Sequence, residues 1–427
     1  MKENCLSVVR ISTINQDARI HLISHYPEII SLPYSDQMAI YNKSGYTYSN
    51  AFSKAMNSLG YNAHEIVYDF QEMQKTWARE HNIPWNEEWR KDIILAQISS
   101  LKPDIILFQD HDPVFPKETR TKWKEKFPFI QLLLLHKGSR SPASEVGEYD
   151  VVFSAYPEIH EDYLKAGISS HLLYHGFDHY RLPQLQKKTE QYECTFSGSS
   201  GFGICEHRLR YWTLNELFNV TCLQGWIQEN ESFIPSNPEP FFIRCHDFIQ
   251  RKAYKVREYG LIYTGSWAVK YLSKKISEQK LHHDDLSYSD KIKEPDSPLS
   301  KHYPMKIHPP VHGINMLNLL HNSKISLQIG GDAQIFKQNG SMRQFEITGT
   351  GSLLLMDHGD NINDLFIPDK EIMTFSSTAE CIENIQYLLE NEDERIKIAQ
   401  NGQKRTLKNH TTLCRCKEMD RTIQELI

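Results

Sequence analysis

An arginine and a glutamate one helical turn apart are the residues of this chain best spaced to do chemistry. They lie in the stretch from Asn339 to Asp357, NGSMRQFEITGTGSLLLMD. Ser341, followed three residues later by Gln344, forms a capping-box pattern, in which each side chain hydrogen-bonds a backbone N–H at the start of a helix. The pattern predicts a helix that begins at Met342.

The first turn of this predicted helix is a candidate anion site. Backbone N–H groups at a helix start carry partial positive charge, and Arg343 adds a full charge beside them. Glu346 lies one turn further along on the same side of the helix. A diphosphate is the natural guest of such a site. An ordinary helix with a surface ion pair is the alternative explanation.

Two glycines define how this helix ends. Gly349 and Gly351, on either side of Thr350, stop the helix and allow the backbone of a neighbour to approach closely. The apolar run Ser352–Met356 follows directly. Such a run predicts a central strand of a parallel sheet.

A second candidate phosphate site lies earlier in the chain. Cys194–Ser197 is predicted as a strand, and the small residues GSSGFG, beginning with Gly198 and Ser199, follow it. The predicted helix after this loop carries Arg208 and Arg210. A glycine-rich turn between strand and helix can bind phosphate through its backbone N–H groups. Its spacing fits neither the Walker nor the dinucleotide fingerprint, so the motif alone is not specific.

Polar residues also follow two predicted strands of the N-terminal half. The cluster QDHDP, which contains Asp110, comes after Asp104–Phe108, and His136 comes after Phe129–Leu135. Open parallel sheets bind ligands at the carboxyl ends of their strands. Asp110 is therefore a candidate general base, with a solvated loop carboxylate as the alternative.

Two tyrosines are candidate contacts for a ligand ring. Tyr46 and Tyr48 lie in a polar, aromatic segment before the first predicted helix. Aromatic rings can stack on a sugar, although packing in the core or at its rim is the commoner role.

The elements that position these residues form two alternating series of strands and helices. The first series runs from residue 19 to 178, and the segment between its first strand and Tyr48 is predicted as a loop. Its predicted strands are Arg19–Ser24, Ala63–Val67, Asp104–Phe108, Phe129–Leu135, Asp150–Phe153 and Ser170–Tyr174, and its helices are Tyr48–Leu59, Asp69–Asn82 and Trp89–Ser100. The second series has predicted strands Cys194–Ser197, Asn219–Leu223, Ile325–Ile329 and Ser352–Met356, and helices Gly265–Ile276, Gly313–His321, Thr378–Glu390 and Glu392–Lys408.

Length and pattern together predict two domains. A chain of 427 residues exceeds what one hydrophobic core holds. We expect an N-terminal domain over residues 1–182, a linker over 183–191 and a C-terminal domain over 192–410. The C-terminal domain contains an irregular insertion at about 229–303. A final helix over 411–427 is expected to pack back on the N-terminal domain.

Composition excludes several classes of partner. The formal net charge of −6 and the even spread of Lys and Arg argue against nucleic acid. No apolar run reaches the roughly 20 residues that span a bilayer, and no secretory signal is recognisable. The eight cysteines form no Cys-x-x-Cys pair, so we expect reduced thiols, no metal site and a cytoplasmic location.

The residues Arg343-Gln344-Phe345-Glu346, followed by Gly349, an apolar strand and Asp357, resemble the R-x-F-E signature of the spore-maturation-protein-B-like group 1 glycosyltransferases. The segment HGINMLNLLHNSKISLQI before the motif and YLLENEDERIKIAQNGQKRTLKNHT after it are also similar to that family. The resemblance covers most of the second half of the chain and is weaker in the first half.

This resemblance implies the α/β GT-B fold, two Rossmann-like doubly wound domains that face each other across a cleft. It implies a nucleoside-diphosphate sugar, UDP- or GDP-linked, as donor substrate, with no cofactor and no metal. Arg343, Gly198, Ser199, Arg208 and Arg210 would hold the diphosphate.

Further roles follow from the same resemblance. Glu346 would accept hydrogen bonds from the ribose hydroxyls, with Gly349 and Thr350 beside it. His136 is similar to the first-domain histidine that group 1 enzymes place near the sugar, with a simple loop histidine as the alternative. Arg343 would also stabilise the charge that grows on the leaving group, which makes His136, Asp110 and Arg343 the candidate catalytic residues.

One position departs from the family pattern. The first acid of the usual pair falls at Gln338, which carries no charge, so the sugar contact must be made differently. The expected function is transfer of a sugar to a glycan, lipid-linked or small-molecule acceptor, retaining and metal-independent, with peripheral membrane contact compatible with the sequence. A nucleotide-sugar epimerase and a non-catalytic nucleotide-sugar-binding protein of the same fold remain alternatives.

Overall fold

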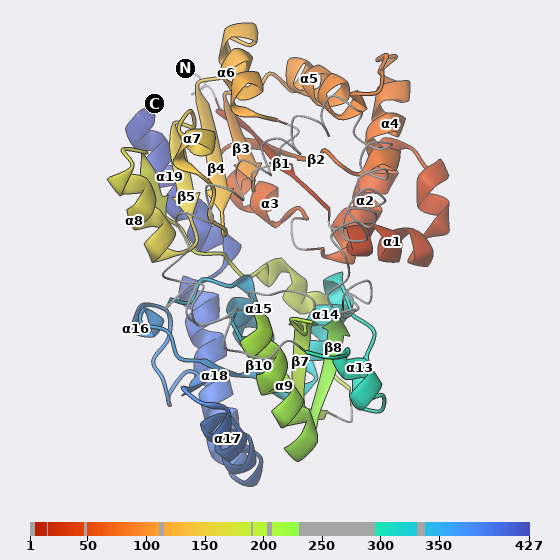
Figure 1. Cartoon of the computed structure of the whole chain (residues 1–427). Coiled ribbons are helices and arrows are strands. Elements are labelled where there is room, and N and C mark those ends of the chain that lie inside the picture. Colours follow the sequence, from red (N-terminus) through yellow and green to blue (C-terminus); the bar gives the residue numbers. More distant parts are fainter. Residues whose placement is uncertain are drawn as a thin grey trace, which may run out of the picture.

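The chain folds around two parallel sheets, as a computed structural model shows (Figure 1). The structure describes residues 5–14, 16–46, 49–110, 115–188, 191–202, 207–229, 295–330 and 338–427. The helix predicted at Gly265–Ile276 and nearly all of the predicted insertion lie outside these residues.

The first sheet has six parallel strands in the order β2-β1-β3-β4-β5-β6. The strands are β1 (Ser7–Ser12), β2 (Asn62–Val67), β3 (Ile105–Gln109), β4 (Leu132–Lys137), β5 (Val151–Ser154) and β6 (Ser170–Leu172). The helices are α1 (Gln16–His25), α2 (Tyr34–Ser44), α3 (Ala51–Ser58), α4 (Gln71–Glu80), α5 (Trp89–Leu101), α6 (Lys117–Lys126), α7 (Ala143–Val146) and α8 (Pro157–Lys165), with short 3-10 turns at Pro27–Ser31 and His179–Gln184.

The start of this sheet differs from the prediction. The first strand is Ser7–Ser12, whereas the predicted strand Arg19–Ser24 lies inside α1. Ala18 and Leu22 of α1 are buried four residues apart, which is helical spacing. The strand was missed because Arg10 interrupts its apolar run, yet Arg10 is buried and forms an ion pair with Glu65 of β2, with Nε 2.7 Å from the carboxylate.

The segment before α3 was also predicted wrongly. Residues predicted as a loop form α2 and the first 3-10 turn. One face of α2 packs on α4, with Gln37 and Tyr41 buried. Tertiary packing on α4 therefore stabilises a helix whose apolar periodicity is poor.

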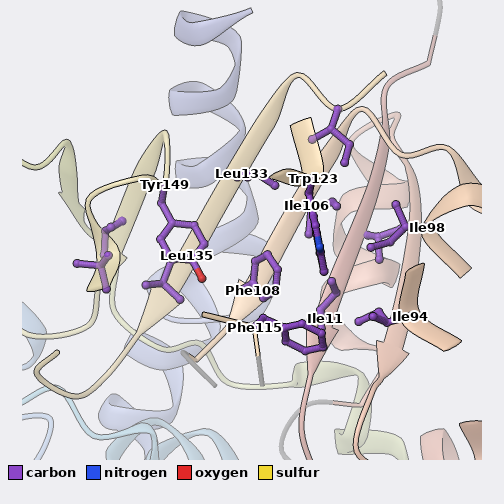
Figure 2. Packing of buried hydrophobic residues seen from close by; sticks show 14 of the residues in the cluster. Ile11, Ile94, Ile98, Ile106, Phe108, Phe115, Trp123, Leu133, Leu135 and Tyr149 are labelled. Atoms are coloured by element: carbon purple, nitrogen blue, oxygen red, sulfur yellow. The ribbon is translucent and has the colours of Figure 1, made fainter. Parts of the chain in front are cut away.

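The core of the first sheet lies between its strands and helices α5 and α6 (Figure 2). Figure 2 shows Ile106, Phe108, Leu133 and Leu135 from the strands facing Trp123 of α6 and the α5 residues Ile94 and Ile98. Strands buried on both faces read as continuous apolar runs, which is why β3 and β4 were predicted correctly.

The second sheet also has six parallel strands, in the order β12-β11-β10-β7-β8-β9. They are β7 (Tyr192–Ser199), β8 (Leu223–Gln228), β9 (Ile307–His308), β10 (Ser323–Gln328), β11 (Leu353–Asp357) and β12 (Met373–Phe375). The helices are α9 (Arg208–Val220), α13 (Leu299–His302), α14 (Gly313–His321), α15 (Met342–Thr350), α16 (Ile362–Leu365), α17 (Thr378–Glu390), α18 (Glu392–Asn409) and α19 (Thr412–Leu426).

The strand predicted at Asn219–Leu223 is placed too early. Residues 219 and 220 are the last turn of α9, and the strand runs from Leu223 to Gln228. Gly225 and Trp226 lie inside this strand. Gly225 sits under the ring of Phe218, where an added Cβ would lie 2.7 Å from the ring carbon Cζ, so a close contact and not a turn explains this glycine.

The last helix returns to the first sheet. After α18, the chain enters α19, which lies beside the N-terminal strands in Figure 1. Cys416, Met419 and Ile423 of α19 join a buried cluster with residues of α3 and of strands β1 to β5. The two sheets with their flanking helices form the predicted α/β architecture of two doubly wound units.

Candidate functional site

The first turn of α15 is built as the sequence predicts, with one difference. The hydroxyl of Ser341 accepts a hydrogen bond from the backbone N–H of Arg343 at 3.3 Å, which caps the helix. Gln344 does not complete the capping box. Its side chain is fully buried, and neither polar atom has a partner among the described residues. Half of the capping box therefore holds the helix start.

Arg343 and Glu346 form an ion pair along α15. Nη1 of Arg343 lies 2.9 Å from Oε2 of Glu346, and the side chains are 26% and 13% exposed. Nη1 also contacts the sulfur of Met316 on α14. Both charged groups are thus held on the side of α15 that faces a cavity.

This cavity, which we call the α15 cavity, has a volume of about 370 Å³. It lies at the carboxyl ends of β7 and β10, the edge where parallel sheets bind ligands. Its lining residues are His175, Phe196, Ser197, Gly198, Arg210, Met316, Leu327, Gln328, Ile329, Ser341, Met342, Arg343 and Glu346. The structure therefore brings together four of the residues that were predicted to bind the sugar donor, namely Gly198, Arg210, Arg343 and Glu346.

The glycine-rich segment contributes to this cavity from its strand end. Gly198 and Ser199 are the last two residues of β7 and not part of the loop that follows. Gly201 has φ of +87°, and an added Cβ would lie 2.3 Å from the carbonyl oxygen of His207, so the turn requires glycine. Arg210 donates from Nε to the carbonyl of Gly330 at 2.9 Å, which fixes its guanidinium at the cavity wall.

Arg208 and Ser199 lie outside the α15 cavity. Arg208 is the first residue of α9 and does not line it. Ser199 lines a neighbouring cavity of about 500 Å³ between the two sheets, which we call the interdomain cavity. That cavity is lined by Thr13, Ile14, Ala18, Tyr41, Tyr46, Ser197, Gly198, Ser199, Trp226, Gln228, Pro310, Val311, His312, Gly313, Met316 and Arg343. The two cavities share Arg343 and Gly198, so they adjoin at the start of α15.

Tyr46 reaches the interdomain cavity, whereas Tyr48 lies outside the described residues. The Tyr46 ring is 7% exposed, and its hydroxyl is 2.8 Å from Nδ1 of His21 on α1. Burial raises the pKa of Tyr46. The ring is thus largely packed, with one part at the cavity wall.

His136 lies in a third cavity of about 80 Å³, which we call the histidine cavity. The residue is the fifth of β4, not a loop residue after the strand. Nε2 donates to the carbonyl of Leu173 at 3.0 Å, and Nδ1 accepts from the amide of Gln109 at 3.2 Å. Burial lowers the pKa of His136 to about 4, so the ring is neutral. Both ring nitrogens are used by the protein itself.

Asp110 does not share a cavity with His136. Its backbone has φ of +71°, and Oδ1 pairs with the ammonium of Lys137 at 2.8 Å. It lines a separate small pocket with Thr13, Tyr68 and Phe115. The neighbouring His111 and Asp112 lie outside the described residues.

Three further predicted residues hydrogen-bond other groups of the protein and lie outside the α15 cavity. Gln338 accepts, through Oε1, a hydrogen bond from the backbone N–H of Glu158 at the start of α8, 2.9 Å away. The carbonyl of Gly349 accepts from the amide of Gln403 at 3.1 Å. The hydroxyl of Thr350 bonds the carbonyl of Glu346 at 2.8 Å. None of the three predicted residues lines the α15 cavity.

Gln328 and His175 also line the α15 cavity, although neither was among the predicted site residues. Gln328 is the last residue of β10, and its buried Oε1 has no partner among the described residues. His175 lies three residues after β6 and lines both the α15 and the histidine cavities. Their common signal is a polar residue at the carboxyl end of a predicted strand.

Comparisons with known proteins agree with this geometry. Residues 272–421 match the family described as glycosyl transferase-like. The structure of Alr3699/HepE from Anabaena in complex with UDP-glucose superposes with a TM-score of 0.54 at 9% identity, covering 98% of this chain and all of that chain. A glycosyltransferase from Rickettsia africae ESF-5 gives 0.51 at 11% identity, covering 99% of both chains. No curated protein matches the sequence.

The structural neighbours and the family match bear on the predicted fold and the predicted resemblance. The fold is GT-B, as expected for two doubly wound units of this topology. The family match confirms the predicted resemblance to group 1 glycosyltransferases, and the matched segment contains α14, β10 and α15, which line the α15 cavity.

One finding concerns membranes. Among the residues that the structure describes, no helix combines the length and the apolarity needed to cross a bilayer.

Proposed function

We propose that the protein transfers a sugar from a nucleoside-diphosphate sugar to an acceptor, with the donor bound in the α15 cavity. The observation that carries this proposal is the convergence of Arg343, Arg210 and Glu346 on one cavity at a helix start. Two guanidinium groups and a helix N-terminus suit a diphosphate, and a carboxylate suits vicinal hydroxyls. The Anabaena protein of the same fold is described in complex with UDP-glucose, which makes UDP the first nucleotide to test and GDP the second.

The chemistry follows from these charges. When the bond between sugar and diphosphate breaks, negative charge grows on the leaving phosphate. Arg343, Arg210 and the first-turn N–H groups of α15 would stabilise that charge without reorganising. In this proposal they supply the positive charge that a metal ion supplies elsewhere, and the transfer retains the anomeric configuration.

Domain closure would complete the site. The interdomain cavity and the histidine cavity are lined by residues of both halves of the chain, so an acceptor entering between them would meet the donor away from bulk water. The acceptor is a glycan, a lipid-linked molecule or a small molecule.

A panel of nucleotide sugars tests the proposal. The melting temperature is measured with UDP-glucose, UDP-N-acetylglucosamine, GDP-mannose and the free nucleotides. A ligand at 100-fold its dissociation constant adds roughly 2.7 kcal/mol to the free energy of unfolding. No shift with any nucleotide would overturn the proposal.

Product analysis then separates transfer from its alternatives. Each nucleotide sugar that shifts the melting temperature is incubated with and without a mixture of sugar and glycan acceptors. Release of nucleoside diphosphate that requires an acceptor identifies a transferase. Conversion of the donor without an acceptor identifies an epimerase, and binding without turnover identifies a non-catalytic protein.

A further inference from the structure

The loop that links β6 to the next 3-10 turn holds a histidine that lines two cavities. His175 lines the α15 cavity together with Arg210 and Gln328, and it lines the histidine cavity together with His136. Glu346 is also common to both cavities. His175 therefore stands where the proposed donor site opens toward the N-terminal sheet.

The imidazole of His175 is available to a ligand. Within the part of the chain that the structure describes, neither of its ring nitrogens has a hydrogen-bond partner, in contrast to His136, whose two nitrogens bond Leu173 and Gln109. Burial, with smaller effects of His136 and Arg415, lowers the pKa of His175 to about 3. A neutral imidazole both donates and accepts one hydrogen bond, which matches a sugar hydroxyl better than a phosphate.

The backbone around His175 is fixed by the C-terminal segment. The carbonyl of His175 accepts from Nε of Arg415 at 3.1 Å, and Phe177 pairs with Thr411 as an isolated β-bridge. At Gly176 an added Cβ would lie 2.7 Å from the backbone nitrogen of Thr412, so the loop fits closely against this segment. The ring is thus carried by a loop with little freedom to move away.

Gly138, on the opposite side of the cavity, leaves just enough room for the imidazole ring of His175. A Cβ added at Gly138, which follows β4, would lie 3.0 Å from Nε2 of His175. The His136 and His175 ring centroids are 5.1 Å apart with the planes at 52°, so the two rings do not hydrogen-bond each other. The space in front of His175 is bounded but not filled by protein.

We infer that His175, and not the predicted His136, hydrogen-bonds the sugar of the bound donor and so contributes to selection of that sugar. This inference rests on the proposed function. His136 then acts as a positioning residue that closes the wall behind His175.

Titration of nucleotides with and without the sugar tests this role. His175→Leu fills the space without a hydrogen-bonding group, and His175→Asn keeps a donor and an acceptor. His171→Ala, on the exposed part of β6, is the matched control. Dissociation constants are measured for UDP and UDP-glucose, and for GDP and GDP-mannose, after circular dichroism has shown that each variant is folded.

We expect the His175→Leu substitution to change the affinities for the two ligands of each pair by different factors. His175→Leu weakens binding of the nucleotide sugar about 10-fold, which is the effect of one lost hydrogen bond. It leaves the dissociation constant of the free nucleotide within about twofold of the wild-type value. His175→Asn restores part of the loss, and His171→Ala changes neither. Equal weakening of sugar-linked and free nucleotide, or no weakening by His175→Leu, would overturn this inference alone. A wild-type protein that binds none of the four ligands would overturn the proposed function as well.

Discussion

At the scale of single residues, Arg343 divides its guanidinium between Glu346 and the sulfur of Met316. The carboxylate offsets part of its positive charge, so an incoming diphosphate competes with Glu346 for the same donors. In the proposed donor complex, Glu346 would become available to the ribose hydroxyls once Arg343 bonds phosphate. The pair would then couple the diphosphate of the donor to its ribose.

His410 gives a prediction about pH at this scale. Nε2 lies 2.9 Å from the carbonyl of Leu365 and donates to it, and Nδ1 accepts from Arg415 at 2.7 Å. A second proton would place two donors face to face. Burial, followed by the charge of Arg415, accordingly lowers the pKa of His410 from 6.5 to about 4.

The sign of the pH effect follows from this lowered pKa. Between pH 6.5 and 4 the unfolded chain binds a proton at His410 that the folded chain does not bind. As the pH falls through this range, the free energy of unfolding therefore falls by about 1.4 kcal/mol per pH unit for this group. We expect His410→Gln to reduce the slope of the unfolding free energy against pH by the equivalent of one proton. The slope is measured by urea unfolding at pH 7, 6, 5 and 4.5. An unchanged slope would show that His410 titrates normally.

The sequence predicted the placement of Arg343 and Glu346 better than that of the histidines. Arg343 and Glu346 lie on one helix, so their spacing alone places them together. His136 lies on β4 and His175 in the loop after β6, and the choice between them depends on hydrogen bonds to Leu173 and Gln109 that sequence spacing does not contain. Side-chain partners across a fold are set by tertiary packing.

At the scale of elements, α15 is positioned by a close contact near its carboxyl end. Gly349 lies against the ring of Phe177, where an added Cβ would be 2.4 Å from Cδ1. Phe177 is fully buried in a cluster with Phe345, Ile347 and Leu354. The glycine therefore lets α15 approach the segment that carries His175.

Gly349→Ala tests this contact. We expect a loss of about 1–3 kcal/mol in the free energy of unfolding, because the methyl group overpacks the site. Phe177→Leu in the same chain should relieve part of the clash, so the double variant loses less than the sum of the single variants. Losses that add within about 0.5 kcal/mol would show that the two residues do not interact.

Element prediction succeeded where the burial pattern was simple. Strands such as β3, β4 and β11 are continuous apolar runs and were placed within three residues of their bounds. The strand β1 was missed because its buried Arg10 is compensated by Glu65 from β2, a partner 55 residues away. Long-range compensation of this kind leaves no local signal.

At the scale of the whole molecule, several kinds of contact join the two halves of the chain, among them close approaches of Gly313 to Ser44 and of Gly340 to Ala155. Gln338 bonds the start of α8, Gln228 of β8 bonds Asp17 of α1, and α19 packs on the N-terminal sheet. The first two are single polar contacts, whereas α19 buries a row of side chains. We therefore expect α19 to stay attached to the N-terminal sheet when the two domains move.

Ile423 tests the attachment of α19. Its side chain is fully buried against the N-terminal sheet, and Ile423→Ala should cost about 2–5 kcal/mol of unfolding free energy. Leu426 on the same helix is 46% exposed, so Leu426→Ala should stay within about 0.5 kcal/mol of the parent. Equal effects of the two substitutions in denaturant titrations would contradict this packing.

The central claim is that the first turn of α15 holds a nucleoside diphosphate. Calorimetric titration of UDP and GDP into the wild type, Glu346→Ala and the exposed control Glu383→Ala tests it most directly. We predict that one nucleotide binds the wild type and Glu383→Ala alike. Glu346→Ala should bind it roughly 10- to 100-fold more weakly, as expected for lost hydrogen bonds to a charged group. Equal affinity of Glu346→Ala and the wild type would contradict the claim.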